Sequence, residues 1–313
     1  MEDIKIDFVD FWPDLIKTNN FFYNLLSEFY RVVIDTANPD LVFYSCFGYD
    51  HLKYNCKRIF YTGENIRPNF SGCDFAFSFD FNNKKNHYRL PLYLFYIDDH
   101  KMINKLENLK VKEEYREIWS KKTKFCCMVV SNPKAIKRIE FFNTLSKIKR
   151  VDSGGAVLNN VGGRVKDKME FINDYKFVIS FENESQDGYT TEKILEPIFK
   201  DCIPIYWGNK WVHEDFNPAR FINYHDFNSE EELIQKLIEI DQNFDLGVDM
   251  ISQAVFATEK QDWNIERKHI LLMIESVLKL KKKPIAKTFT GNFYYLKIKL
   301  KSVKKKLKNT LVK

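Results

Sequence analysis

Residues 177–208 read FVISFENESQDGYTTEKILEPIFKDCIPIYWG and carry the clearest architectural signal of the chain. An apolar run ends at Glu182-Asn183, and a polar loop then leads to Tyr189–Thr191. Glu192-Lys193 open a helix-like segment, and Ile203–Gly208 has the composition of a second strand. In α/β proteins with this order of elements, ligands bind outside the carboxyl ends of the strands. The free N–H groups at such a helix start favour a phosphate-bearing ligand, so we expect a nucleotide-linked substrate here.

The composition fits a globular protein of about two domains. Apolar residues make up 44% and charged residues 29% of the 313 positions, which is typical of a soluble globular protein. The net charge of +6 hides an asymmetry, because residues 281–313 hold 12 Lys and no acid. The other 280 residues carry 37 basic and 43 acidic side chains, a net of −6. We therefore expect a mildly acidic body with a strongly basic tail.

Targeting signals and cysteine pattern favour a cytoplasmic protein. Residues 1–20 include acids and no long apolar core, so we expect no signal peptide. No stretch approaches the ~18 uncharged apolar residues of a membrane span. The six Cys show no CxxC spacing, and we expect all of them to be reduced.

Hydrophobic periodicity predicts alternating strands and helices along the chain. Expected strands are residues 4–9, 32–34, 41–44, 58–61, 74–79, 124–130, 176–181, 203–208 and 221–223. Expected helices are residues 21–30, 134–147, 167–175, 229–240 and 263–280. This pattern predicts one α/β domain over residues 1–118, a second α/β domain over 119–280 and a basic tail over 281–313.

The central stretch also resembles a known family. FENxxxxxYxTEK, followed by an apolar helix and IPIxxG, closely resembles the donor-binding signature of the α-1,3/1,4-fucosyltransferases of glycosyltransferase family 10, bacterial type. The resemblance covers roughly residues 3–245. It implies the GT-B architecture, in which two Rossmann-like domains face each other across a cleft.

The same resemblance implies an activity. L-Fucose would move from GDP-β-L-fucose to a GlcNAc hydroxyl, with inversion, and α-1,3 linkage is favoured over α-1,4. The acceptor would be a lipopolysaccharide or an N-acetyllactosamine-type glycan. Beyond the donor substrate GDP-fucose, no cofactor is expected.

Glu64 is the expected general base, because an alcohol is a poor nucleophile until a base takes its proton. It follows a predicted strand in Tyr61–Asn65, where Gly63 permits a sharp turn. FYTGEN resembles the acceptor-side loop of the family, whose Glu is taken as the base. The alternative interpretation is a solvated loop carboxylate.

Arg138 and Lys193 are the expected partners of the leaving diphosphate. Arg138 lies one turn into a predicted helix, matches the SNPxxxxR element of the family and presents a fork suited to phosphate oxygens. Lys193 stands at a helix start, where the dipole disfavours a cation unless an anion binds. Ordinary surface charge is the alternative for both.

The nucleoside and sugar contacts are expected around the same helix start. The resemblance assigns Glu192 to the ribose hydroxyls, and Tyr189 can donate to phosphate or stack. Asn183 and Glu182 end the strand and are further candidate contacts with GDP-fucose. Thr191 fits a helix N-cap. The loop Gly162–Lys166 either closes over the nucleotide or is a plain flexible loop.

The sequence lacks the motifs of several other classes of nucleotide-binding and metal-binding proteins. The chain has neither GxGxxG nor GxxxxGK[ST], and its six His show no metal-ligand spacing, so no metal site is predicted. Asp98–His100 is interpreted as a solvated loop. Two rivals stay open: another GT-B transferase with a different GDP-sugar, and a non-catalytic glycan-binding module.

The tail predicts a basic amphipathic helix. Apolar residues at 296, 300, 303, 307 and 311 form one helical stripe, with Lys around the rest. Residues 287–313 therefore favour attachment to the inner face of the cytoplasmic membrane, as in similar bacterial tails. Nucleic-acid binding fits the tail less well, because aromatic residues precede the stripe. The remaining alternative is a disordered tail that only increases solubility.

Overall fold

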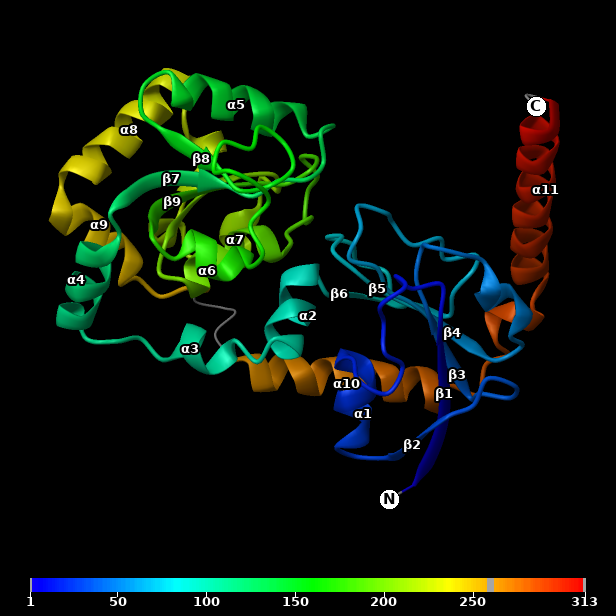
Figure 1. Cartoon of the computed structure of the whole chain (residues 1–313). Coiled ribbons are helices and arrows are strands. Elements are labelled where there is room, and N and C mark those ends of the chain that lie inside the picture. The colour runs from blue at the N-terminus through cyan, green and yellow to red at the C-terminus, as the bar shows by residue number, and fades with distance from the viewer. Residues whose placement is uncertain (1, 258–261, 312–313) are drawn as a thin grey trace. The chain divides into compact units, whose positions relative to one another are not determined.

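The computed structural model describes residues 2–257 and 262–311, with side chains as far as residue 300. It contains two α/β units (Figure 1). The first runs to Leu90 and resumes at Asp262, and the second occupies the chain from Pro91 up to this return. Each unit contains its own sheet, which confirms the predicted α/β class.

The first unit is built on a six-stranded sheet in the order β2-β1-β3-β4-β5-β6. All neighbouring strands pair in parallel. The strands are β1 (Asp3–Val9), β2 (Arg31–Ile34), β3 (Leu41–Tyr44), β4 (Lys57–Phe60), β5 (Phe75–Ser78) and β6 (His87–Arg89). Since β2 and β3 pair on opposite sides of β1, the strand order reverses there, and ligands favour such switch points.

Aromatic side chains fill one face of this sheet. Phe22 of α1 (Phe21–Ser27) stacks on Phe43 with ring centroids 4.8 Å apart, and Phe43 stacks on Phe8 at 5.1 Å. Helix α10 (Trp263–Lys279) joins α1, since the rings of Trp263 and Phe21 lie 5.9 Å apart. Phe8, Phe22 and Phe43 thus serve core packing here, as expected from their size.

Two short elements and the tail helix cover the opposite face. Alternation along β3 places Tyr44 there, where it stacks on His51 of the 3₁₀ turn η1 (Asp50–Lys53). The 3₁₀ turn η6 (Ile285–Lys287) precedes α11 (Phe289–Leu311), whose Tyr294 is buried against Gly72. The predicted tail helix is therefore present, but the side chains of stripe positions 303, 307 and 311 lie outside the described residues.

The second unit has a five-stranded sheet in the order β11-β10-β9-β7-β8, again parallel throughout. Its strands are β7 (Lys124–Met128), β8 (Val151–Ser153), β9 (Tyr175–Phe181), β10 (Ile203–Trp207) and β11 (Ile222–Asn223). The chain runs from β7 to β8 on one side and then crosses to β9 on the other. The switch point of this sheet thus lies between β7 and β9.

Helices cover both faces of the second sheet (Figure 1). The helices of this unit are α2 (Leu92–Asp99), α3 (Ile103–Glu107), α4 (Lys112–Lys121), α5 (Ile136–Ser146), α6 (Lys168–Ile172), α7 (Glu192–Phe199), α8 (Glu230–Gln242) and α9 (Phe244–Ile251), of which α4 to α9 pack on the sheet. Short 3₁₀ turns are η2 (Val212–Glu214), η3 (Pro218–Arg220) and η4 (Tyr224–Asp226). Phe177 and Ile179 join a core with α4, α5, α8 and α9, whereas Val178 points to the α6 side.

The predicted elements are largely confirmed, but the units divide the chain at other positions than 118 and 280. Helix α10 returns to the first unit, where Glu275 accepts a hydrogen bond from Tyr30 and Glu266 one from Tyr88. The segment Asp98–His100, expected as a loop, instead ends helix α2. All six Cys are unpaired. Within the described residues, no helix combines the length and the apolar character that crossing a membrane requires.

Candidate active site

The predicted donor-side residues meet at the carboxyl edge of the second sheet, at its β7/β9 switch point. Arg138 lies in α5, which follows β7, and Glu182 comes directly after β9. Helix α7 begins at Glu192, one position before Lys193. The structure therefore brings together side chains that are up to 55 positions apart in the sequence.

Arg138 is nearly buried, with 4% of its surface exposed. Its Nη2 donates to the carbonyl oxygen of Phe181, which ties α5 to the end of β9. Its Nε is buried and has no hydrogen-bond partner within the described part of the chain. Burial lowers the pKa of Arg138, but a guanidinium stays charged in proteins. A fixed positive charge with spare donor capacity thus lies at the end of β9.

Thr191 caps helix α7, as expected from its residue type. Its Oγ1 accepts a hydrogen bond from the backbone N–H of Lys193. Its own N–H and hydroxyl both donate to Oε1 of Glu182, each at 2.8 Å. The helix start is therefore fixed to the strand end through a carboxylate.

Glu182 is the deepest of the predicted residues, and its side chain has no exposed surface. Adjacent packing encloses it, because a Cβ added to Gly208 would lie 2.6 Å from its Cγ. Burial raises the pKa of Glu182, while the nearby ammonium of Lys193 opposes that rise. This burial favours a positioning role over the substrate contact that the sequence led us to expect.

Lys193 lies among oxygen atoms of three side chains. Its Nζ is 3.0 Å from Oγ1 of Thr191, 3.2 Å from Oε2 of Glu182 and 3.3 Å from Oε1 of Glu192. Burial disfavours the charged form, but the two carboxylates outweigh it and raise the pKa of Lys193. The cation disfavoured by the helix dipole is thus stabilised by carboxylates as well as by any bound anion.

The other predicted donor contacts differ in their exposure. Glu192 is partly exposed, and although burial opposes its charge, Lys193 and Lys168 lower its pKa. Tyr189 is buried, with 4% exposure. Asn183 is exposed at the strand end. Glu192 and Asn183 are therefore open to a ligand from solvent.

Asn209 is a site-supporting residue that the sequence reasoning missed. It is fully buried, and its Oδ1 accepts from the N–H of Gly188 at 2.7 Å. Its Nδ2 donates to Oγ1 of Thr190 at 3.0 Å. Gly188 has a φ of +83°, a conformation that glycine adopts readily. The only sequence signal was an amide residue just after a strand, which is common in turns.

The loop at Gly162-Gly163 also lies in the second unit. Both glycines have positive φ, and Nδ2 of Asn159 donates to the carbonyl oxygens of Gly155 and Gly163. Nη2 of Arg164 donates to Oγ of Ser131, 2.8 Å away. The loop is thus held next to the SNP segment that follows β7.

Glu64 lies in the first unit, in the loop that follows β4, and it is exposed. Its N–H donates to Oγ1 of Thr62 at 3.1 Å. Among the described residues, the glycines with positive φ are Gly162, Gly163 and Gly188. The turn at Gly63 therefore does not use the left-handed conformation that glycine readily adopts.

Family models match both halves of the chain. Residues 6–96 match the α-(1,3)-fucosyltransferase FucT N-terminal domain, and residues 119–248 match the C-terminal part of glycosyltransferase family 10 (fucosyltransferase). A crystal structure of an α1,3-fucosyltransferase with GDP-fucose is 31% identical, with a TM-score of 0.75 over 90% of this chain and 92% of that one. The chain belongs to glycosyltransferase family 10.

Curated relatives support the same family assignment. The chain is 37% identical over 287 residues to the α-(1,3)-fucosyltransferase FucT of Helicobacter pylori, covering 79% of this chain and 59% of the relative. It is 36% identical over 128 residues to mouse 4-galactosyl-N-acetylglucosaminide 3-α-L-fucosyltransferase 9, covering 39% and 34%. The chain thus spans less than two thirds of the length of these curated relatives.

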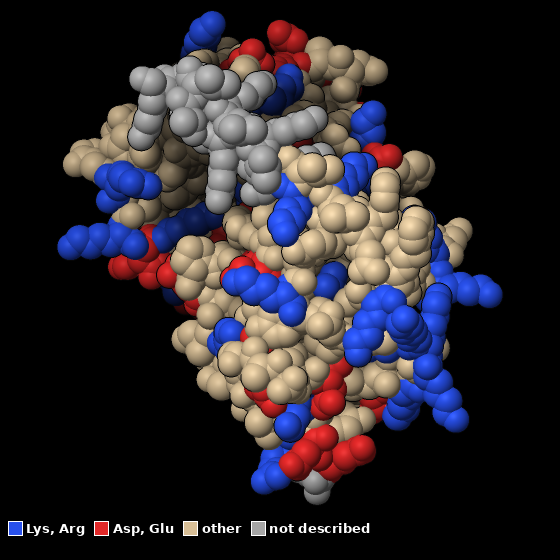
Figure 2. Space-filling model, turned by 90° about the vertical axis from the view of Figure 1, so that its right-hand side faces the viewer, with Lys and Arg blue, Asp and Glu red and all other residues tan. Residues whose placement is uncertain are grey.

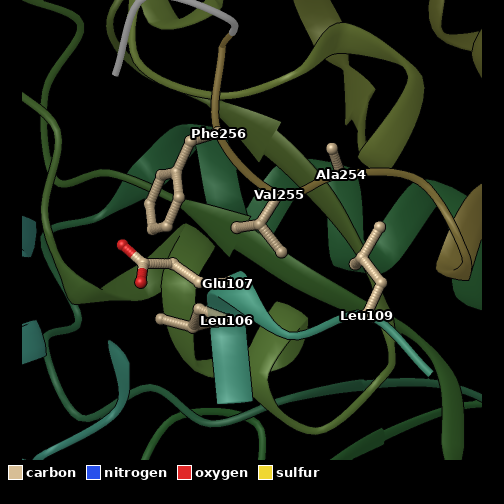
Figure 3. A pocket seen from close by; sticks show the side chains of 6 residues that line it. All are labelled: Leu106, Glu107, Leu109, Ala254, Val255 and Phe256. Atoms are coloured by element: carbon tan, nitrogen blue, oxygen red, sulfur yellow. The ribbon is translucent and has the colours of Figure 1, made fainter. Parts of the chain in front are cut away.

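A pocket in the second unit is lined by none of the predicted site residues (Figure 3). It measures about 200 Å³ and is lined by Leu106, Glu107, Leu109, Ala254, Val255 and Phe256. One carboxylate among apolar side chains does not suit an anionic nucleotide. No group of three or more His, Cys, Asp or Glu placed to hold a metal ion occurs in the part of the chain that the structure describes.

Proposed function

We propose that this chain transfers L-fucose from GDP-β-L-fucose to a GlcNAc hydroxyl with inversion, forming an α-1,3 rather than an α-1,4 linkage. The observation that most supports this proposal is the cluster of positively charged groups at the β7/β9 switch point. There a buried guanidinium, a lysine ammonium and the start of α7 converge on one sheet edge. Such a set suits a nucleoside diphosphate, whose leaving group gains negative charge during transfer.

The donor roles follow from chemistry and exposure. Arg138 and Lys193 would neutralise the diphosphate, and Glu192 would accept hydrogen bonds from the ribose hydroxyls. Tyr189 and Asn183 would contact the phosphate, nucleoside or fucose. Glu182 would hold Lys193 and Thr191 in place from beneath, since its side chain is not exposed.

The proposed step is a direct displacement at C1 of fucose. The acceptor oxygen forms a bond to C1 while the bond from C1 to the diphosphate oxygen breaks, and GDP leaves with that electron pair. Glu64 takes the proton of the acceptor hydroxyl. The sugar passes through an oxocarbenium-like state, and attack opposite the leaving group converts the β-linked donor into an α-fucoside.

The acceptor is proposed to be an N-acetyllactosamine-type glycan, including that of a lipopolysaccharide. The name of the mouse relative specifies a 4-galactosyl-N-acetylglucosaminide as its acceptor and position 3 as its linkage. The H. pylori relative is likewise named for the α-1,3 linkage. These names support the preference for α-1,3.

The test is GDP release from GDP-fucose, with and without N-acetyllactosamine or its isomer Galβ1-3GlcNAc. We expect release to be stimulated by N-acetyllactosamine, whose GlcNAc has a free 3-hydroxyl. Stimulation only by Galβ1-3GlcNAc would overturn the linkage, and transfer only from GDP-mannose would overturn fucose. Glu64→Gln is expected to abolish transfer while GDP affinity is kept; unchanged turnover would remove Glu64 from the mechanism.

We further propose that the protein is cytoplasmic and peripheral on the membrane through residues 287–313. The described start of α11 supports this, since Phe289 is 87% and Phe293 63% exposed. Leu296 and Leu300 continue this exposed stripe, and Lys297 and Lys299 are exposed beside it. Figure 2 shows Lys and Arg side chains projecting at several places on the side of the molecule that it presents, with Asp and Glu among them.

Vesicle sedimentation tests this attachment. Removal of residues 296–313 leaves the buried Tyr294 in place and is expected to abolish binding to vesicles with anionic lipid. Equal binding of the truncated and full chains would contradict the proposal. Salt-sensitive binding to DNA rather than to vesicles would point to nucleic acid instead.

A further inference from the structure

Two exposed aromatic side chains flank the loop of Glu64 in the first unit. Phe47, in the loop after β3, is 51% exposed, and Phe81, in the loop after β5, is 49% exposed. Glu64 is in the loop after β4, the strand between these two. Because the strands are parallel, all three loops leave the same edge of the sheet.

Side-chain contacts confirm that the three loops are neighbours. Sγ of Cys46, the residue before Phe47, lies 3.2 Å from Oγ1 of Thr62. On the other side, Nε of Arg67 donates to Oδ1 of Asp80, the residue before Phe81, at 2.7 Å. Thr62 and Arg67 belong to the Glu64 loop. With strands about 4.8 Å apart, the two aromatic loops are separated by roughly 10 Å.

Each aromatic residue is supported by its surroundings. The N–H of Phe47 donates to the carbonyl oxygen of Asp10, and the Asp10 carboxylate accepts from the backbone of Asp50 and His51. The guanidinium of Arg89 lies 4.2 Å from the centroid of the Phe81 ring. The exposed rings thus project from fixed backbone at the carboxyl edge of a parallel sheet, where ligands bind in open α/β folds.

A glycan fits this arrangement better than a peptide or a lipid. A pyranose ring has an apolar C–H face and a polar rim, so a flat aromatic ring can cover the face while water solvates the rim. Two separate rings with a carboxylate between them suit a ligand that alternates apolar and polar surface. A membrane or an apolar helix would need a continuous apolar area instead.

We propose that Phe47 and Phe81 form two acceptor subsites on either side of Glu64, each stacking on the apolar face of one pyranose ring. This inference rests on the proposed function. It specifies an acceptor of at least two sugars, because one pyranose ring cannot stack on both Phe47 and Phe81 while its hydroxyl faces Glu64. Phe47 and Phe81 are thereby assigned to acceptor affinity, and the donor-side residues of the second unit are not involved.

The experiment measures transfer to N-acetyllactosamine and to GlcNAc by the full chain, with GDP-fucose in excess. We expect Phe47→Ala and Phe81→Ala each to raise KM for N-acetyllactosamine by about tenfold. The advantage of the disaccharide over GlcNAc is expected to shrink in both. GDP affinity and acceptor-independent hydrolysis of GDP-fucose are expected to stay unchanged, which also reports correct folding.

Matched variants separate stacking from general damage. Phe29 is also 49% exposed but precedes β2, at the opposite edge of the sheet, so Phe29→Ala is expected to leave KM unchanged. Phe81→Trp keeps a flat ring and is expected to preserve KM. Phe81→Leu keeps apolar volume without the ring and is expected to behave like Phe81→Ala.

The outcomes distinguish this inference from the proposed function. If the wild-type chain transfers fucose but both alanine variants keep its KM, the subsites are overturned and the function stands. If the wild-type chain shows no transfer, N-acetyllactosamine binding is measured directly by saturation-transfer NMR. Binding that both alanine variants lose would support the subsites without the reaction, and absence of binding by the wild-type chain would overturn them.

Discussion

Nζ of Lys193 lies 3.2 Å from Oε2 of Glu182, a carboxylate whose side chain has no exposed surface. The other oxygen of this carboxylate accepts hydrogen bonds from the N–H and hydroxyl of Thr191. One buried group therefore holds both the cation and the cap of helix α7. The contact with Glu182 therefore orients the Lys193 ammonium before a donor substrate binds from solvent.

Glu182→Gln is expected to lower stability and turnover together. The amide has the size of the carboxylate but lacks its charge and offers only one acceptor oxygen, so either Thr191 or Lys193 loses a partner. Loss of a hydrogen bond to a buried charged group costs about 2 kcal/mol of unfolding free energy. GDP affinity should not weaken, because the site gains one net positive charge. Urea unfolding, GDP titration and fucose transfer measure the three quantities.

Glu231→Gln provides the matched control, because Glu231 is exposed in the first turn of α8. It is expected to change none of the three quantities measurably. Wild-type stability and turnover in Glu182→Gln would show that the contact between Glu182 and Lys193 does not position the site.

Lys193→Met is expected to make stability depend more strongly on pH. Burial raises the pKa of Glu182, and the Lys193 ammonium opposes that rise. Without the ammonium the pKa rises further, so the folded state holds a proton that the unfolded state releases. Stability is then greatest at low pH and falls as pH rises from the unfolded pKa through the folded one. Each pKa unit adds about 1.4 kcal/mol to this fall, which urea unfolding at several pH values measures.

The double variant Glu182→Gln, Lys193→Met isolates the carboxylate in this pH dependence. Both Lys193→Met and the double variant lack the effect of Lys193 on Glu192. The difference between their pH profiles of stability therefore reports Glu182 alone. The two variants should diverge most above the folded pKa of Glu182. Identical pH profiles for the single and double variants would exclude Glu182 as the titrating group.

Local signals explain what the sequence predicted well. Thr191 and Ser229 accept hydrogen bonds from backbone N–H groups in the first turns of α7 and α8, as their residue types indicated. The apolar runs of β9 and β10 are long enough to be recognised without tertiary information. By contrast, β6 and β8 have three residues each, too few for any periodicity to show.

Tertiary contacts decided the features that the sequence did not predict. The amphipathic pattern of α10 indicates a buried face but not the partner, and the packing of Trp263 on Phe21 returns the helix to the first unit. Glu182 looked like a ligand contact because it ends a strand, and only its packing beneath Gly208 reveals that it is buried. The role of Asn209 likewise depends on a loop whose residues Gly188 and Thr190 lie 21 and 19 positions earlier in the chain.

Arg138→Lys is expected to weaken GDP binding far more than guanosine binding. A lysine keeps the charge but cannot donate to the carbonyl of Phe181 and to phosphate with a rigid fork. We expect a loss of about 2 kcal/mol in GDP affinity, the order of one charge-assisted hydrogen bond. Calorimetric titration with GDP and with guanosine separates the diphosphate contribution from that of the nucleoside.

Lys137→Ala is the control for Arg138, since Lys137 lies on the same helix but pairs with Glu230 at 2.8 Å. Its removal is expected to leave GDP affinity within about a factor of two, as for a partly exposed ion pair. An equal loss of affinity for GDP and guanosine in Arg138→Lys would argue for general disruption of the site.

Asn209→Ala is expected to release the donor-side loop from the end of β10. The change removes the acceptor of the Gly188 and Trp211 N–H groups and the donor to Thr190. The hydrogen bonds with Gly188 and Thr190 are buried, and losing each is expected to cost about 1–3 kcal/mol, so both unfolding free energy and donor affinity should fall. Asn217→Ala, which removes only a cap of the 3₁₀ turn η3, should cost about 1 kcal/mol and spare donor affinity. Equal KM values for GDP-fucose in the two variants would show that the donor site does not need the loop to be held by Asn209.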